Sequence, residues 1–154
     1  NNFESSKYYL EKAKKIADYL VEYQLPEGAW SLDFTEKDSG HIDEKAVAIW
    51  SFLFYRLYHH TEDATYLAAG RKALEWCLNN QYFGEDAQAR GGIVGVSRIS
   101  GVIYRRWFPL QCLYTSGFFG LAVLEELAMQ DSKKGLSADE LRPPLERGST
   151  DVGQ

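Results

Sequence analysis

Apolar residues recur at steps of three and four along two stretches of the chain, with charged residues between them. The first stretch spans about residues 6–24, and the second begins near Thr61 or Asp63 and runs to about Asn80. This spacing predicts amphipathic helices, each with one buried face and one face in water. Thr61 or Asp63 can cap the free amides of the second of these helices. In the first, the apolar positions are Tyr9, Ala13, Ile16, Ala17, Leu20 and Tyr23.

Two further stretches are apolar on nearly all sides. Residues 46–58, AVAIWSFLFYRLY, lie in a helix predicted over about 43–59, and residues 113–129 are charged only at Glu125 and Glu126. A helix of this kind is normally surrounded by other elements. The predicted order is therefore outer, inner, outer, inner. Beyond residue 135 we expect a short helix, ended by two prolines, and a disordered tail over the remainder of 136–154.

The four helices form a tandem repeat. The first and third align at an offset of 57 residues, and the second and fourth at an offset of 70. Aligned pairs include Tyr9/Tyr66, Gln24/Gln81, Trp50/Gly120, Leu53/Val123 and Leu57/Leu127. Repeated helical hairpins stack to share a core. A closed four-helix bundle is the alternative, but it needs no repeated contrast between outer and inner helices. The predicted fold is all-α, with hairpins 6–60 and 61–130 forming one domain over residues 1–135.

Residues 15–30, KIADYLVEYQLPEGAW, resemble the QW repeat of the squalene cyclase and protein prenyltransferase superfamily. Tyr19 and Leu20, Gln24, Gly28 and Trp30 fit that pattern. A similar rhythm recurs in six-hairpin glycosidases, sugar epimerases and polysaccharide lyases. The resemblance covers about residues 6–130 and implies part of an α/α toroid, with a ligand in its central cavity. The aspartate-rich motif of the cyclases and the zinc ligands of the prenyltransferases are absent from the sequence, which argues against terpenoid chemistry.

The segment QLPEGAW, residues 24–30, is predicted to be a structural joint. Glutamine at a helix end can bond free backbone groups of its own or the next helix. Glycine permits the tight turn that follows. Trp30 can cover the junction between the two layers.

Catalytic residues are sought first in the loop over residues 31–45, which is rich in carboxylates. His41 and Asp43 are the catalytic candidates, because a histidine beside carboxylates could do acid–base work on a glycosidic bond or an epimerisable carbon. The alternative is that Asp43 and Glu44 stabilise the positive end of the second helix and that His41 is a solvated loop residue.

A second loop, residues 90–111, combines arginines and aromatic residues and has no acidic residue. Arginine matches carboxylate, sulfate or phosphate oxygens with a planar fork, and aromatic rings can stack on sugars. The predicted substrate-binding residues are Arg90, Arg98, Tyr104, Arg105, Arg106 and Trp107. The alternative is that the arginines pair with acids of a neighbouring hairpin or brace the loop. The glycines lack the Gly-Lys-Ser/Thr ending of a phosphate loop.

Composition narrows the class of protein. The apolar content is 45% and the formal net charge is −5, so the chain can build a core but does not favour nucleic acid. It lacks both an apolar run of ~20 residues and a signal-peptide pattern, and the cytoplasm is favoured. Cys77 and Cys112 are interpreted as buried free thiols, with one disulfide as the alternative. No metal site or cofactor is predicted.

Three functions follow, in order of preference. The first is a carbohydrate-active or carbohydrate-binding toroid domain for an anionic, uronate-like saccharide; as an enzyme it would be a glycoside hydrolase, lyase or epimerase. The second is a non-catalytic helical-repeat module that binds a partner chain. The third is a protein of the terpenoid cyclase or prenyltransferase type. Because four helices are too few to close a toroid, we expect a homo-oligomer or a longer chain, and in both cases an exposed apolar flank.

Overall fold

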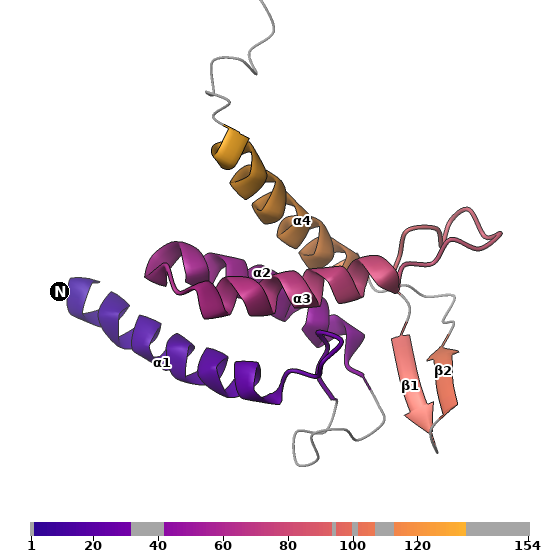
Figure 1. Ribbon diagram of the computed structural model, residues 1–154, viewed down its shortest axis with the longest axis horizontal. Helices are drawn as coiled ribbons and strands as arrows, with labels where there is room; N and C mark the ends of the chain where they lie inside the picture. The colour runs from indigo at the N-terminus through magenta and orange to yellow at the C-terminus, as the bar shows by residue number, and fades with distance from the viewer. Residues whose placement is uncertain (1, 32–41, 94, 100–101, 107–112, 135–154) are drawn as a thin grey trace, which may run out of the picture.

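The computed structural model describes residues 2–31, 42–93, 95–99, 102–106 and 113–134. This part of the chain contains four helices and one antiparallel hairpin (Figure 1). The helices are α1 (Asn2–Tyr23), α2 (Glu44–Thr61), α3 (Ala64–Asn79) and α4 (Leu113–Lys134), and the strands are β1 (Gly95–Ile99) and β2 (Val102–Arg106). All four predicted helices are confirmed. The short helix and tail expected over 136–154 lie outside the described residues.

The strands β1 and β2 correct the sequence prediction, which treated residues 90–111 as a loop. The two strands pair from Gly95 opposite Arg106 to Ile99 opposite Val102. Each strand is rich in β-branched residues, and two residues separate them, which is a spacing typical of a hairpin. Because glycines and arginines surround these two short strands, the sequence pattern predicts a loop over the whole segment.

The core is built on α2 and α3, which join through a tight corner. Glu62 adopts a left-handed conformation with φ 56° and donates its amide to the Tyr58 carbonyl, which ends α2. Asp63 then caps α3, its carboxylate accepting from the Thr65 amide at 2.9 Å; of the two caps that the sequence left open, Thr61 and Asp63, the structure therefore selects Asp63. Side chains of α2, including Val47, Phe54 and Tyr55, are fully or almost fully buried. The prediction that this helix is surrounded is therefore largely correct.

The segment after α1 is the structural joint that was predicted. Gln24 Nε2 donates to the Gly28 carbonyl and to the Ala69 carbonyl, each at 3.0 Å, so it ties the end of α1 to α3. Trp30 is fully buried, donates Nε1–H to the Leu20 carbonyl at 2.7 Å and stacks on Phe54 of α2. This joint therefore connects the first three helices.

The second copy of the motif keeps the same local bond. Gln81 Nε2 donates to the Gly91 carbonyl at 2.9 Å, as Gln24 does to Gly28. Both glycines have positive φ, 99° at Gly28 and 88° at Gly91. The prediction that glutamine bonds backbone groups after each helix is correct, but the acceptors differ from those predicted: they are loop carbonyls in both copies and, for Gln24, a carbonyl of α3 in place of the next helix, α2.

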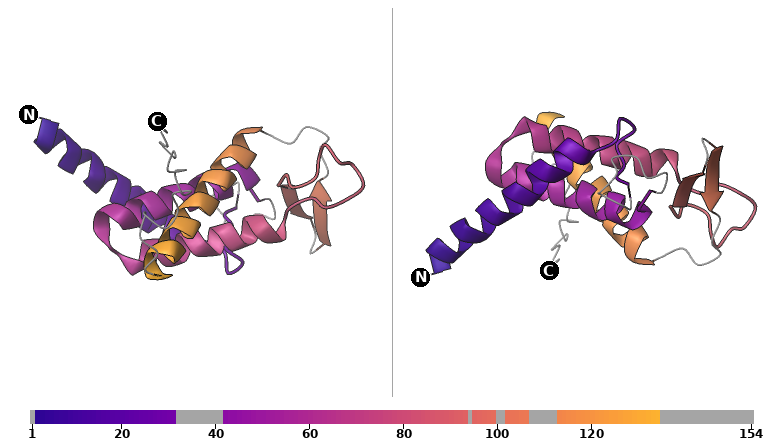
Figure 2. Two further views of the ribbon diagram at one scale, coloured as in Figure 1. Left: turned by 90° about the horizontal axis from the view of Figure 1, so that it is seen from above. Right: turned by 90° about the horizontal axis from the view of Figure 1, so that it is seen from below.

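Helix α1 is buried over a shorter length than its sequence predicts. Ala17 and Leu20 are in the core and Tyr23 is partly buried, but Tyr9 is 68% and Ile16 55% exposed. The N-terminal half of α1, which carries Tyr9, projects beyond the other helices (Figures 1 and 2), and Ile16 lines a half-open groove between α1 and α2. The apolar stripe is present, but within the described residues no element covers its first half.

Helix α4 also departs from its prediction. An inner helix is expected to be covered on all sides, yet α4 lies across α2 with one side open (Figure 2). Ala122 and Met129 face the core, while Leu121, Leu124 and Leu127 are exposed. The exposed apolar flank expected of too few helices is therefore present.

Candidate functional site

The candidate catalytic residues of the first loop are only partly described. His41 lies outside the described residues. Asp43 is the N-cap of α2, where its Oδ1 accepts a hydrogen bond from the Ala46 amide at 3.2 Å, and Glu44 stands in the first turn. These positions agree with the helix-end interpretation of the two carboxylates, because both satisfy the positive end of a helix.

The predicted saccharide-binding residues are divided by the β-hairpin. The strand register places Arg98 and Arg105 on one face of the ribbon, and Tyr104 and Arg106 on the other. Arg90 precedes the hairpin, is exposed and donates Nη2–H to the Gly84 carbonyl at 3.2 Å. Trp107 lies outside the described residues. The sequence grouped these residues by proximity along the chain, whereas the alternation of the strands separates them into two pairs.

The described part of the chain shows neither a cluster of metal-binding side chains nor a reactive thiol. It contains no group of three or more His, Cys, Asp or Glu side chains arranged to hold a metal ion. Cys77 is a free, buried cysteine, and burial raises the pKa of its thiol to about 12. The thiol is therefore protonated near neutral pH and a poor nucleophile. Cys112 lies outside the described residues. Among the described helices, none has the length and apolarity to cross a bilayer.

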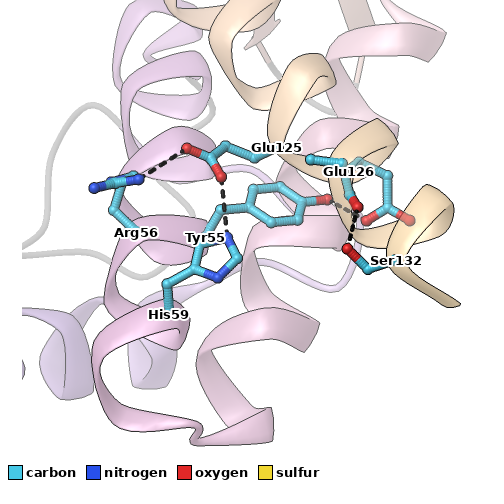
Figure 3. A network of polar contacts seen from close by, with 7 residues as sticks. Tyr55, Arg56, His59, Glu125, Glu126 and Ser132 are labelled. Carbon is cyan, nitrogen blue, oxygen red and sulfur yellow. Dashed lines mark hydrogen bonds and ion pairs between the residues drawn. The ribbon is translucent and has the colours of Figure 1, made fainter. Parts of the chain in front are cut away.

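A polar network that the sequence prediction missed holds α4 against α2 and α3. Glu126 of α4 receives two bonds from Arg71 of α3, Nε to Oε2 at 2.8 Å and Nη2 to Oε1 at 3.0 Å. The buried Tyr55 of α2 donates its hydroxyl to the same carboxylate at 2.9 Å, and Gln130 adds a bond from within α4. Figure 3 shows Tyr55 pointing from α2 to Glu126.

Electrostatics of this network favour an ionised carboxylate. Partial burial raises the pKa of Glu126, but the bonds from Arg71, Gln130 and Tyr55 outweigh it, so the pKa lies below its usual value. Burial and the bond to Glu126 raise the pKa of Tyr55. These bonds satisfy the carboxylate, so the network holds α4 in position against α2 and α3.

Glu125 makes a second polar contact between α4 and α2. Its Oε1 lies 3.4 Å from Arg56 Nη1 and its Oε2 lies 3.0 Å from His59 Nε2, as Figure 3 shows. His59, in the last turn of α2, thus contacts a carboxylate on another helix. One signal was available: Glu125 and Glu126 are the only charges in an otherwise apolar segment, and a carboxylate there needs partners.

The exposed side of α4 is the largest unexplained feature of the described residues. Tyr114, Leu121, Leu124 and Leu127 are 42–62% exposed and lie on one side of the helix. A methyl group added at Gly117 or Gly120, between them, would meet no atom within 4 Å. We call this surface, with its two glycines, the α4 apolar face.

The internal repeat shows what this face corresponds to. At the offset of 70 residues, Leu121, Leu124 and Leu127 match Ser51, Phe54 and Leu57 of α2. Those three residues are at most 8% exposed. Ser51 and Phe54 pack on α3: Ser51 Oγ donates to the Gly70 carbonyl at 3.0 Å, and Phe54 stacks on Tyr66. The face that α2 buries against an outer helix is thus open in α4.

A second apolar surface lies at the other end of the helix array. A half-open groove of about 370 Å³ separates α1 from α2. Its lining is mostly apolar, and Arg56 and His60 are its charged or titratable residues. The side chains include Leu10, Ile16, Leu20, Trp50 and Leu53. The chain therefore presents apolar surface on both its first and its last described helix.

Comparison of the chain with protein-family models, with curated proteins and with solved structures finds no match. The toroid superfamily suggested by the QW-like repeat therefore stays a prediction. The described structure supports the broader statement, a helical protein with four helices in its described part.

Proposed function

We propose that this chain is a non-catalytic helical-repeat module that binds a helix of a partner chain through the α4 apolar face. The proposal rests on the internal repeat, in which the α4 apolar face matches the face of α2 that packs on α3. Leu121 and Leu124 stand where α2 has Ser51 and Phe54, which pack on a helix. A contiguous exposed apolar patch is typical of an interaction surface. An amphipathic helix laid on such a patch is a recurring mode of recognition.

The geometry of the face suits a helical partner. Gly117 and Gly120 leave a shallow surface beside the leucines, which lets another helix approach closely. Glu126 is bonded to α3 and α2, which fixes the rotation of α4 and keeps its apolar side outward. The binding surface is therefore formed before the partner arrives, which lowers the cost of association.

A peptide of α3, Ala64–Asn79, tests this proposal, because α3 covers the matching face of α2. We expect a fluorescein-labelled peptide to bind the protein saturably in fluorescence anisotropy. Leu121→Glu/Leu124→Glu should weaken binding at least ~10-fold, since charge on the face must be desolvated. Both residues are exposed, so the variant should keep its helical circular dichroism.

Leu78→Glu is the matched control. Leu78 is also a leucine, 47% exposed, but it belongs to α3 and is not part of the α4 apolar face. This variant should bind the peptide as the parent protein does. Absence of peptide binding, or equal affinity in the double variant and the parent, would refute the proposed function.

The hairpin supports a second candidate, binding of an anionic, uronate-like saccharide. Arg98 and Arg105 belong to the same ribbon face, at diagonal positions of neighbouring strands. Two guanidinium groups on one face can each bind a carboxylate of an extended acidic chain. The observation in favour is this shared face; the catalytic roles of His41 and Asp43 are no part of the candidate.

Calorimetric titration with a uronate oligosaccharide tests that candidate. Binding should be weakened at least ~10-fold by Arg98→Ala/Arg105→Ala, because each lost contact removes a charge-assisted bond. Arg106→Ala is the control, since Arg106 lies on the opposite face of the ribbon. If the parent protein gave no binding heat in the titration, or if the two variants lost affinity equally, saccharide binding at this face would be contradicted.

A further inference from the structure

We propose that the partner of the α4 apolar face is a second copy of this chain, which contributes the exposed apolar positions of its α1, Tyr9, Ala13 and Ile16. This inference rests on the proposed function and names the partner for the same surface. The copies would join head to tail, and each junction would repeat the packing of α2 on α3 that is present within one chain.

The α2–α3 contact provides the template. The two helices approach closely at Gly70, where an added methyl group would lie 3.1 Å from Phe54 Cβ and 3.3 Å from the Ser51 carbonyl oxygen. Tyr66 and Ala73 of α3 are buried on either side of this glycine. The outer helix thus offers a face with a small central residue and a tyrosine one turn earlier.

Helix α1 carries the same face in exposed form. At the offset of 57 residues, the α3 residues Tyr66, Gly70, Ala73 and Cys77 match Tyr9, Ala13, Ile16 and Leu20 of α1. All four α3 residues are buried, whereas Tyr9, Ala13 and Ile16 are exposed and only Leu20 is in the core. The central residue is again small. Three of the four positions that α3 buries are therefore exposed in α1, and two of them, Ala13 and Ile16, line the half-open groove beside α2.

The α2–α3 contact has two sides, and the chain exposes a copy of one side on α4 and a copy of the other on α1. The α4 apolar face is the counterpart of the α2 side, and the exposed positions Tyr9, Ala13 and Ile16 of α1 are the counterpart of the α3 side. Each surface complements the other and not itself, so the resulting contact is heterologous. A second copy is the occupant that supplies the missing half with the sequence pattern already present in this chain.

The mass of the unmodified protein in solution tests this assembly. Sedimentation velocity should give the parent protein a mass above the 17.5 kDa monomer that rises with concentration. Ile16→Glu blocks the α1 surface and Leu124→Glu blocks the α4 apolar face. Each variant alone should be monomeric, because both residues are exposed in the monomer and needed only at the junction.

A mixture of the two variants tests directly whether the α1 surface of one copy binds the α4 apolar face of another. The Leu124→Glu protein keeps an intact α1 surface and the Ile16→Glu protein keeps an intact α4 apolar face. An equimolar mixture should form a heterodimer of about 35 kDa, twice 17.5 kDa, and stop there because both outer surfaces are blocked. Leu78→Glu should assemble as the parent does.

Three results would overturn the inference: a parent protein that is monomeric at all concentrations, a mixture that stays monomeric, or self-association retained by Ile16→Glu. The last would indicate a symmetric α4–α4 contact. If the α3 peptide binds while the parent protein stays monomeric, the proposed function survives and the partner is a different chain. If the peptide fails to bind as well, both proposals fail.

Discussion

Replacing Trp30 with alanine is expected to lower the free energy of unfolding by about 3–5 kcal/mol, the usual cost of deleting a buried aromatic side chain. Trp30 is fully buried and stacks on Phe54 with ring centroids 5.9 Å apart. Its indole N–H also satisfies the Leu20 carbonyl in the last turns of α1. The substitution removes packing at the point where three helices meet. Urea unfolding followed by circular dichroism measures the loss.

Trp30→Phe separates the two contributions of the indole. Phenylalanine keeps an aromatic ring near Phe54 but cannot donate to the Leu20 carbonyl, so we expect a smaller loss of about 1–3 kcal/mol. Phe83→Ala is the control for aromatic deletion as such, because Phe83 is 69% exposed; its effect should stay within about 0.5 kcal/mol. A Trp30→Ala protein as stable as the Phe83→Ala protein would show that the joint does not hold the core together.

Gly28→Ala is expected to cost about 3–5 kcal/mol, since backbone strain and a steric clash act together. Gly28 has φ 99°, which an L-residue rarely adopts. A methyl group there would overlap the Lys72 carbonyl oxygen and would lie 2.6 Å from the Lys72 carbonyl carbon. These are backbone atoms of α3, so relief requires the joint to move away from the helix. The same urea unfolding measurement applies.

Gly91→Ala isolates the strain from the clash. Gly91 is the counterpart of Gly28 in the second copy, with φ 88°, but an added methyl group there meets no atom within 4 Å. Only the conformational cost of about 1–3 kcal/mol remains. Equal losses at the two glycines would mean that α1's joint does not approach α3 as closely as the structure describes.

Helix positions could be predicted because they depend on local rules. Apolar spacing located all four helices, and Asp63 indicated the start of α3 through its capping side chain. The role of QLPEGAW was also readable, because glutamine at a helix end and glycine in a turn have local physical reasons. The observed bonds of Gln24 and Gln81 agree with that interpretation.

The candidate sites were harder to predict because they depend on contacts across the chain. Glu126 holds α4 in place through bonds to Tyr55 and Arg71, which are 71 and 55 residues away along the chain. The arginines of residues 90–111 form one group in the sequence, but strand alternation places Arg98 and Arg106 on opposite faces. Asp43 had two predicted roles; its bond to the Ala46 amide agrees with the helix-end role, and the catalytic role stays a prediction.

The sequence by itself determined the helices, their repeat and the joint after α1, because hydrogen bonding, capping and periodicity act over a few residues. Only the tertiary structure decided which apolar faces are buried. Tyr66 and Tyr9 occupy equivalent positions in the repeat, yet one is 2% and the other 68% exposed. The physical reason is that burial depends on what lies opposite a residue. For α3 the opposing helix is α2; for the first half of α1 and the outer side of α4 we infer that it is another copy of the chain.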